Sequence, residues 1–244
     1  MPTDSEIKSA VKQTYDQIAR GERSCCSDLV ELRGDGRGYT SEELATLPEG
    51  SALGLGCGNP TQVLPIEVGM TVLDLGSGAG VDAFLAARKV GPTGRVIGVD
   101  MTASMIEKAR ANAIAGGYTN VEFRLGEIED LPVESGAVDL ILSNCVINLA
   151  PDKSKVFAEA FRVLQPGGRI QISDLVTRGT MPEPVRGDLE NWTGCIAGAL
   201  DREVYLDLIR QAGFSQVEVR EEWAYDAYRT DEFAVLSISV VAIK

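Results

Sequence analysis

Short apolar runs alternate with segments of helical length from residue 70 onward, and this alternation most strongly limits how the chain can fold. The apolar runs are nearly continuous, as strands are when helices cover both faces of a sheet. The pattern predicts strands at 71–76, 95–100, 121–126, 138–144 and 169–175 and helices at 81–90, 102–117 and 152–164. Strands that alternate with helices form a parallel sheet through right-handed crossovers.

The C-terminal part breaks this alternation. A predicted helix at 201–214 is followed by two strand-like runs, 217–224 and 234–244, with no helix between them. Two consecutive strands indicate an antiparallel hairpin at the edge of the sheet. The sequence therefore predicts an α/β, Rossmann-like fold with a seven-stranded, mostly parallel sheet, an antiparallel C-terminal hairpin and helices on both faces.

The first sixty residues have a different character. Apolar residues at helical spacing predict a helix over 4–20, whereas 21–60 is rich in glycine, serine and charge, with one short helix at 41–46. We expect residues 1–60 to form an N-terminal helix and a cysteine-containing flap. Residues 61–244 are expected to form the main domain, and the two parts to make one structural unit.

Charge and composition narrow the function. The chain has 23 basic and 36 acidic residues, a formal net charge of −13, and no histidine. An acidic surface repels phosphates and anionic lipids, which argues against nucleic-acid and membrane partners. No apolar run approaches the ~18 residues of a membrane-spanning helix, and the polar N-terminus lacks a signal-peptide pattern. We expect a cytoplasmic enzyme that acts on a small molecule without imidazole chemistry.

The segment DLGSGAG, from Asp74 to Gly80, links the first strand to its helix and predicts a nucleotide site. Gly76, Gly78 and Gly80, with Ser77 between the first two, let the backbone turn tightly and approach a ligand. Such a loop also suits NAD, but the third glycine of the NAD pattern is absent. Asp74 can face the ammonium end of an amino-acid cofactor, and LQPGGRI before the fifth strand is typical of methyltransferases. We therefore favour S-adenosylmethionine (SAM).

Further SAM contacts are expected at the ends of the neighbouring strands. Asp100 ends the second strand, where a carboxylate can accept both ribose hydroxyls. Met101 follows it and can lie against the adenine face. After the third strand, the N–H of Ile128 and the carboxylate of Glu129 are expected to contact the adenine, with Glu127 as the alternative carboxylate.

Three cysteines are expected at the same edge, because ligands bind outside the carboxyl ends of the strands in such a sheet. Cys145 directly follows the fourth strand, beside Asn144, which we place near the cofactor. Cys195 lies in the connection after the fifth strand, and Cys57 lies between two glycines ahead of the first. Three thiols suit a soft, thiophilic centre. Zinc is one candidate, and trivalent arsenic, whose lone pair can attack a methyl group, is the other.

Several segments together resemble one family. GCGNP, VLDLGSGAGVDAFLAARKVG, GVDMTASMIEKAR, SNCVINL and CIAGAL fall within residues 50–215, and the chain resembles the arsenite SAM methyltransferases. The resemblance implies that Cys145 and Cys195 hold arsenic(III) and that Cys57 is the third thiol. The SAM-binding residues that it implies are Asp74, Gly76, Asp100, Met101, Ile128 and Glu129.

The resemblance extends loosely to the N-terminal segment. Tyr15 resembles a tyrosine that reaches the amino-acid end of SAM, and Cys25 or Cys26 matches a cysteine that takes part in thiol–disulfide exchange. Arsenic would arrive as a thiol conjugate, and glutathione or thioredoxin would reduce any protein disulfide. Two alternatives stay open: a SAM-dependent C-, O- or N-methyltransferase of a small metabolite, and a protein that only binds a metalloid or zinc.

Overall fold

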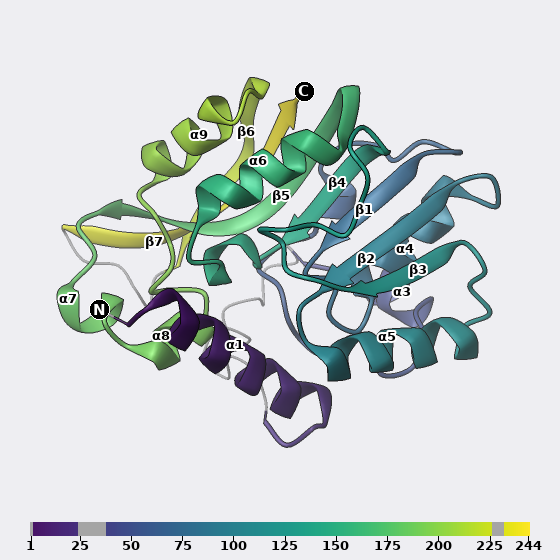
Figure 1. Ribbon diagram of the computed structural model, residues 1–244, viewed down its shortest axis with the longest axis horizontal. Coiled ribbons are helices and arrows are strands. Elements are labelled where there is room, and N and C mark those ends of the chain that lie inside the picture. Colours follow the sequence, from purple (N-terminus) through teal and green to yellow (C-terminus); the bar gives the residue numbers. More distant parts are fainter. Residues whose placement is uncertain (1, 24–37, 226–231) are drawn as a thin grey trace.

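The computed structural model describes residues 2–23, 38–225 and 232–244, and it confirms the predicted fold. The seven strands of these residues lie in one sheet, in the order β3-β2-β1-β4-β5-β7-β6. Strands β1 to β5 run parallel, whereas β7 is antiparallel to both β5 and β6 (Figure 1). The strands are β1 (Thr71–Leu75), β2 (Arg95–Asp100), β3 (Val121–Leu125), β4 (Val138–Asn144), β5 (Leu164–Gly179), β6 (Ser215–Tyr225) and β7 (Phe233–Ile243).

Helices occur where the apolar spacing predicts them. They are α1 (Asp4–Ala19), α3 (Ser41–Ala45), α4 (Val81–Val90), α5 (Ala103–Ala115), α6 (Lys153–Val163) and α9 (Arg202–Gln211). Two further helices, α7 (Glu183–Arg186) and α8 (Leu189–Thr193), were not predicted. Among the helices described, none combines the length and apolar character that crossing a bilayer demands.

Two apolar layers cover the sheet. Val72 of β1 packs in the layer with α4 and α5, whereas the next residue, Leu73, packs in the layer with α6 and α9. Neither side chain is exposed, because successive residues of a strand face opposite sides and both sides are covered here. This explains why the central strands are apolar without alternation.

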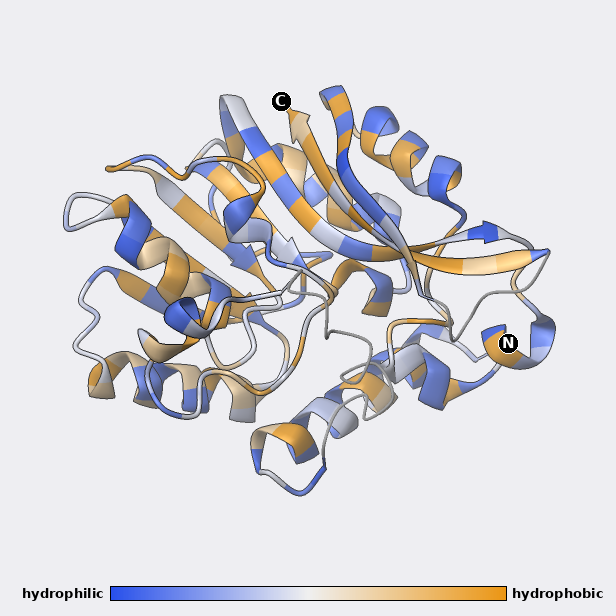
Figure 2. Ribbon diagram, turned by 180° about the vertical axis from the view of Figure 1, so that it is seen from behind, coloured by the Kyte–Doolittle hydropathy of each residue, from blue (hydrophilic) through white to orange (hydrophobic). Residues whose placement is uncertain are grey.

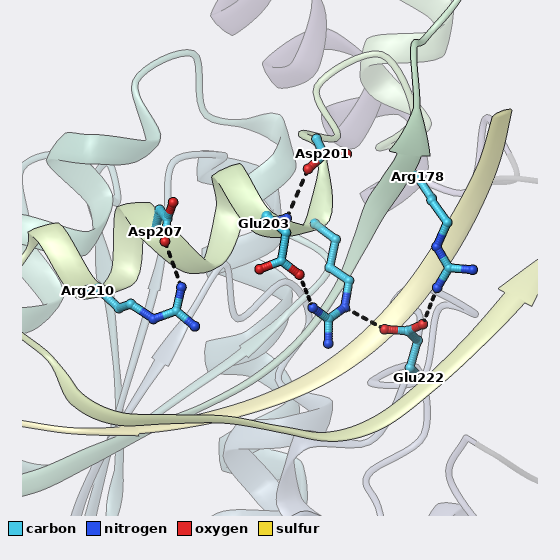
Figure 3. A network of polar contacts seen from close by, with 7 residues as sticks. Arg178, Asp201, Glu203, Asp207, Arg210 and Glu222 are labelled. Carbon is cyan, nitrogen blue, oxygen red and sulfur yellow. Dashed lines mark hydrogen bonds and ion pairs between the residues drawn. The ribbon is translucent and has the colours of Figure 1, made fainter. Parts of the chain in front are cut away.

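The antiparallel end of the sheet is half exposed. Strand β7 is apolar along most of its length and buried, while the edge strand β6 alternates in hydropathy (Figure 2). Glu222 of β6 accepts hydrogen bonds from Arg178 of β5 at 2.7 Å and from Arg202 of α9 at 2.6 Å (Figure 3). Exposed ion pairs contribute little individually. This network ties α9 to the sheet edge and lies away from the site described below.

The strand order reverses between β1 and β4, and this reversal creates the binding crevice. β1 pairs with β2 on one side and with β4 on the other, and Leu75 lies opposite Ser143. The loops that follow β1 and β4 therefore leave the sheet side by side, at the place where doubly wound sheets bind ligands. Helix α1 packs against α5 and α8 across this end of the molecule (Figure 1).

Two glycines in the turn after β1, Gly78 and Gly80, test whether glycine is required for its backbone angle or for lack of a side chain. Gly80 has φ 104°, and a Cβ there would lie 2.5 Å from the Phe84 ring, whereas Gly78 has φ 51° and open space around the same position. We expect Gly80→Ala to lower the free energy of unfolding by about 3 kcal/mol, and Gly78→Ala by about 1 kcal/mol. Urea unfolding without SAM measures both. Equal losses would mean that φ alone, and not contact with Phe84, requires glycine at position 80.

Candidate active site

A cavity that is partly open to solvent lies at this edge of the sheet, where doubly wound sheets bind small molecules. The loop after β1, the end of β2, the segment 126–129 and the loop after β4 contribute lining residues, and α1 contributes one wall. Predicted site residues that line it are Tyr15, Cys57, Gly76, Gly78, Asp100, Met101, Ile128, Glu129, Asn144, Cys145 and Cys195.

The glycine loop contains buried polar atoms without a partner. Within the described residues, Oδ2 of Asp74 and Oγ of Ser77 make no hydrogen bond, although both side chains are buried. Burial, and then repulsion from Asp82 and Asp100, raises the pKa of Asp74 well above its ordinary value. Buried polar groups normally have a partner. A ligand with a cationic ammonium group and hydrogen-bonding atoms fits these requirements.

Asp100 is held in one orientation at the end of β2. Its Oδ2 accepts from the N–H of Gly78 at 3.0 Å, and its Oδ1 accepts from the N–H of Thr102 at 2.8 Å. Burial raises the pKa of Asp100, an effect that the two N–H donors oppose. Because each carboxylate oxygen can accept more than one hydrogen bond, Asp100 keeps acceptor capacity for a ligand in the cavity.

The structure separates the two candidate carboxylates after β3. Glu129 lines the cavity, and its Oε1 lies 3.0 Å from Nζ of Lys8 on α1. Glu127 does not line it, and its carboxylate lies 2.7 Å from Lys8 and 3.2 Å from Lys12. The position of Glu129 therefore supports the first choice. Lys8 was missed, since a lysine on an amphipathic helix reads as a solvent-facing residue.

Tyr15 joins α1 to the segment that carries Cys195. Its side chain lines the cavity, and its hydroxyl donates to the carbonyl of Thr193 at 3.4 Å. Helix α1 buries Ile7 and Val11 against the same apolar cluster that contains Cys57 and Cys195. The N-terminal helix is thus part of the wall around the thiols.

The three predicted thiols come together. Sγ of Cys57, Sγ of Cys145 and a carboxylate oxygen of Asp174 all lie within 4.8 Å of one another. The Cys195 thiol donates to the carbonyl of Cys145 at 3.0 Å. Hydrogen bonds with Cys195 and Cys57, together with burial, raise the pKa of the Cys145 thiol well above its ordinary value. Without a ligand, the Cys145 thiol is therefore protonated.

Two of these cysteines have an unfavourable backbone conformation. Cys145 has φ 60° and Cys195 has φ 66°, in the left-handed region that residues with a Cβ rarely adopt. Such a conformation costs of order 1–2 kcal/mol per residue and persists where the surrounding structure enforces it. Non-glycine residues at positive φ often mark functional sites.

Asn144 holds the Cys57 segment. Its Oδ1 accepts from the N–H of Cys57 at 2.9 Å and of Gly58 at 3.3 Å, and its Nδ2 donates to the carbonyl of Gly58 at 2.9 Å. Nδ2 also donates to the Tyr39 hydroxyl at 2.8 Å, which in turn donates to Asp82 at 2.8 Å. We expected Asn144 only near the cofactor. Its amide lies between the cofactor loop and the thiol segment.

Asp174 was missed by the sequence analysis. It lies inside β5, fully buried, where its carboxylate accepts from the N–H of Leu175 at 2.9 Å and from the Tyr205 hydroxyl at 3.2 Å. Burial raises its pKa to about 7. The N–H of Cys145 donates to the carbonyl of Ser173 at 2.8 Å, so Asp174 lies level with the end of β4. A polar residue within an apolar strand was the only available signal.

A buried lysine lies next to this cluster. Nζ of Lys153 donates to the carbonyls of Ala150 at 3.0 Å and Asn148 at 3.4 Å, and it lies 5.5 Å from the centre of the Trp192 ring. Burial lowers the pKa of Lys153 to about 8, although the negative groups nearby oppose the shift. The predicted redox residues Cys25 and Cys26 lie outside the described residues.

The fold and the site together indicate the class of protein. A glycine loop and a ribose-type carboxylate at the switch point of a seven-stranded sheet, with β7 inserted antiparallel beside β5, are the features of SAM-dependent methyltransferases. A model of the family "Methyltransferase domain" matches residues 66–219.

Within this class of protein, the chain is similar to several arsenite methyltransferases. The arsenite methyltransferase of Halobacterium salinarum is 51% identical over 200 residues, which are 82% of this chain and 51% of that protein. The human arsenite methyltransferase is 34% identical, over 86% of this chain and 59% of its own length. The crystal structure of an arsenic(III) SAM methyltransferase from Chlamydomonas reinhardtii superposes with a TM-score of 0.71 at 36% identity, covering 87% of this chain and 73% of that one.

The chain belongs to the methyltransferase domain family, in the branch that contains the arsenite methyltransferases. The resemblance drawn from the sequence is confirmed, and so is SAM as the cofactor. The chain spans about half the length of the two curated relatives named above.

The strained backbone of Cys145 gives a stability prediction. Glycine adopts φ 60° without a Cβ penalty, whereas alanine keeps the penalty of cysteine. We expect Cys145→Gly to be about 1 kcal/mol more stable than Cys145→Ala, the reverse of the order in a helix or strand. Urea unfolding of the two variants tests this. An alanine variant at least as stable as the glycine variant would contradict it.

The role of Asn144 gives a second prediction. Asn144→Ala removes the acceptor of two N–H groups and is expected to lower the free energy of unfolding by about 1–3 kcal/mol. It should also speed alkylation of Cys57, which is only 8% exposed, because its segment is released. Asn120→Ala is the matched control, since the Asn120 amide likewise makes several main-chain hydrogen bonds, as donor to the carbonyls of Ala87 and Gly91, which are not part of the thiol site. Equal alkylation rates of Cys57, located by mass spectrometry, in the two variants would refute the role.

Proposed function

We propose that this protein methylates trivalent arsenic, using SAM as the methyl donor and Cys57, Cys145 and Cys195 as arsenic ligands. The observation that carries the proposal is the convergence of the three thiols on the cavity that the glycine loop and Asp100 also line. The similarity to arsenite methyltransferases supports it. A thiol cluster with these properties has no evident use in methyl transfer to carbon, oxygen or nitrogen.

The residues around the cavity suggest how SAM is held. Asp100 would accept the ribose hydroxyls, because its two oxygens are already oriented by Gly78 and Thr102. Asp74 is the candidate partner of the ammonium group, since its Oδ2 lacks one. The glycine loop, with Gly76, Ser77, Gly78 and Gly80, would lie along the amino-acid end, near Tyr15 and Asn144.

The adenine end has a separate set of candidates. Met101 and Ile128 line the cavity with apolar surface, suited to the faces of a planar base. Glu129 has a carboxylate at the same wall, suited to an exocyclic amine. Lys8 contacts Glu129, so it would help to orient that carboxylate.

Arsenic would reach the three cysteines by exchange from a thiol conjugate. In an arsenic(III) thiol conjugate, such as one with glutathione, each arsenic–sulfur bond can be replaced by a bond to a cysteine. Each protein thiol then loses its proton to the departing thiolate, so three thiols leave and three cysteines are bound. No separate base is required, which agrees with a chain that has no histidine.

The transfer step needs mainly proximity. SAM, held by the residues named above, would supply an electrophilic methyl group on its sulfonium. Arsenic bound by the three cysteines would donate its lone pair to that methyl group, so that an As–C bond replaces the C–S bond and S-adenosylhomocysteine would be released. Arsenic is thereby oxidised by two electrons; attack of a thiolate on an arsenic-bound sulfur returns those electrons and forms a disulfide. Glutathione or thioredoxin would reduce it, and the residues' contribution is to hold the reactants close together.

Methylation assays on paired variants test the function. Purified protein incubated with arsenite, glutathione and SAM should produce methylarsenic species, measured by chromatography with mass spectrometry. Cys145→Ser should reduce the product by about a hundredfold or more, since a hydroxyl is a poor ligand for arsenic(III). Wild-type product from Cys145→Ser, or none from the wild-type protein, would contradict the proposal.

Binding measurements provide the control for folding. Cys145→Ser should bind SAM as the wild type does in calorimetry, while losing the arsenite-dependent change in fluorescence of Trp192, which lies three residues before Cys195. Asp100→Asn should behave oppositely, with SAM affinity lowered about tenfold to a hundredfold and the arsenite response kept. Loss of both activities in either variant would point to misfolding.

A further inference from the structure

We propose that Asp174, with the thiols of Cys57 and Cys145, forms a binding site for a thiophilic divalent cation such as Zn²⁺. The ligand atoms of these three residues lie within 4.8 Å of one another, close enough for one ion to reach all of them after small side-chain adjustments. Cysteine sulfur and carboxylate oxygen are both ligands that zinc takes in proteins. This inference concerns a ligand other than arsenic and stands whether or not the protein methylates arsenic.

The carboxylate is oriented for such a role. The N–H of Leu175 binds Oδ1 and the Tyr205 hydroxyl binds Oδ2, so the Asp174 side chain has one position inside β5. Tyr205 is itself fully buried and packs edge-on against Phe157, which holds its hydroxyl in place. Carboxylates that bind metals are typically fixed by such outer hydrogen bonds.

The charge of Asp174 is not balanced by an ion pair. Within residues 2–23, 38–225 and 232–244, no lysine or arginine nitrogen lies within 4.0 Å of this carboxylate, and Lys153 acts on it only through its longer-range field. A buried carboxylate without a paired cation is costly. A divalent ion bound between Asp174 and the two thiols would offset two of the three negative charges of the carboxylate and the two thiolates.

Cys195 is placed to complete the coordination. Its thiol lies beside Cys145, where it donates to the Cys145 carbonyl at 3.0 Å and hydrogen-bonds with the Cys145 thiol. Zinc usually takes four ligands in a tetrahedron, and Cys195 or a water would supply the fourth. Binding would release the thiol protons to solvent.

The geometry distinguishes this cation from arsenic. Arsenic(III) bound by three sulfurs keeps a lone pair at its fourth position, so it gains nothing from a carboxylate there. A divalent cation needs a fourth donor and gains from the negative charge. Asp174 should therefore matter for Zn²⁺ and not for arsenic, although both ligands use Cys57 and Cys145 and must exclude each other.

The test uses Zn²⁺ and Cd²⁺ alone, added to the reduced, chelator-treated protein. Zn²⁺ affinity is measured by competition with a chromophoric chelator, and Cd²⁺ binding by the thiolate-to-cadmium absorption band. We expect one ion per chain, loss of binding in Cys145→Ser, and at least about tenfold weaker binding in Asp174→Asn. The arsenite response of Trp192 should be unchanged in Asp174→Asn and abolished by saturating Zn²⁺ in the wild type.

Two variants keep the test interpretable. Asparagine at 174 keeps one oxygen to accept from the N–H of Leu175, and its Nδ2 can donate to the Tyr205 hydroxyl, which then acts as the acceptor. Thermal melting checks that the fold persists. Tyr205→Phe is the matched control, because it removes the hydroxyl partner but leaves the carboxylate, and its Zn²⁺ affinity should fall by much less than that of Asp174→Asn. The proposal is overturned if the wild type binds neither ion, if Asp174→Asn binds Zn²⁺ as tightly as the wild type, or if Tyr205→Phe loses as much affinity.

Discussion

The parallel pairing of β1 with β4 is the contact on which the rest of the site depends. Leu75 lies opposite Ser143, so both strands end at the same level of the sheet. The loops that follow them lead to opposite sides of the strand-order reversal. The loop after β1 forms the glycine-rich turn, and the loop after β4 begins with Cys145. A single line of main-chain hydrogen bonds thus sets the cofactor loop and the first thiol next to each other, with a crevice between them.

The site is assembled from features that reduce stability. Cys145 and Cys195 adopt left-handed backbone conformations, Asp174 and Lys153 are buried charged groups, and Asp74 lacks a partner for one oxygen. Each of these is unfavourable by itself. The two apolar layers on the sheet offset them, and Asn144 fixes the Cys57 segment through three hydrogen bonds. A rigid scaffold around an unfavourable site is a common property of enzymes.

Much of the fold and part of the site could be predicted from the sequence, because the signals for them are local. Strands such as Val138–Asn144 and helices such as Lys153–Val163 have local apolar periods, and the glycine turn is a local motif. The convergence of the three thiols followed from the rule that ligands bind at the carboxyl ends of strands. The second role of Asn144 did not follow, because nothing near residue 144 indicates contact with a segment 87 residues earlier. Helices α7 and α8 were not predicted either.

By itself, the sequence determined the class of fold and the cofactor, since these depend on local pattern and residue chemistry, and it singled out three cysteines as candidate ligands. The tertiary structure decided how the thiols are surrounded. Asp174 lies beside Cys57 and Cys145 only because of the register between β4 and β5, where Asn144 pairs with Ser173 after a shift earlier in the ladder. Register joins strands that are far apart in the chain, so it depends on the packing of both faces of the sheet and on no single segment.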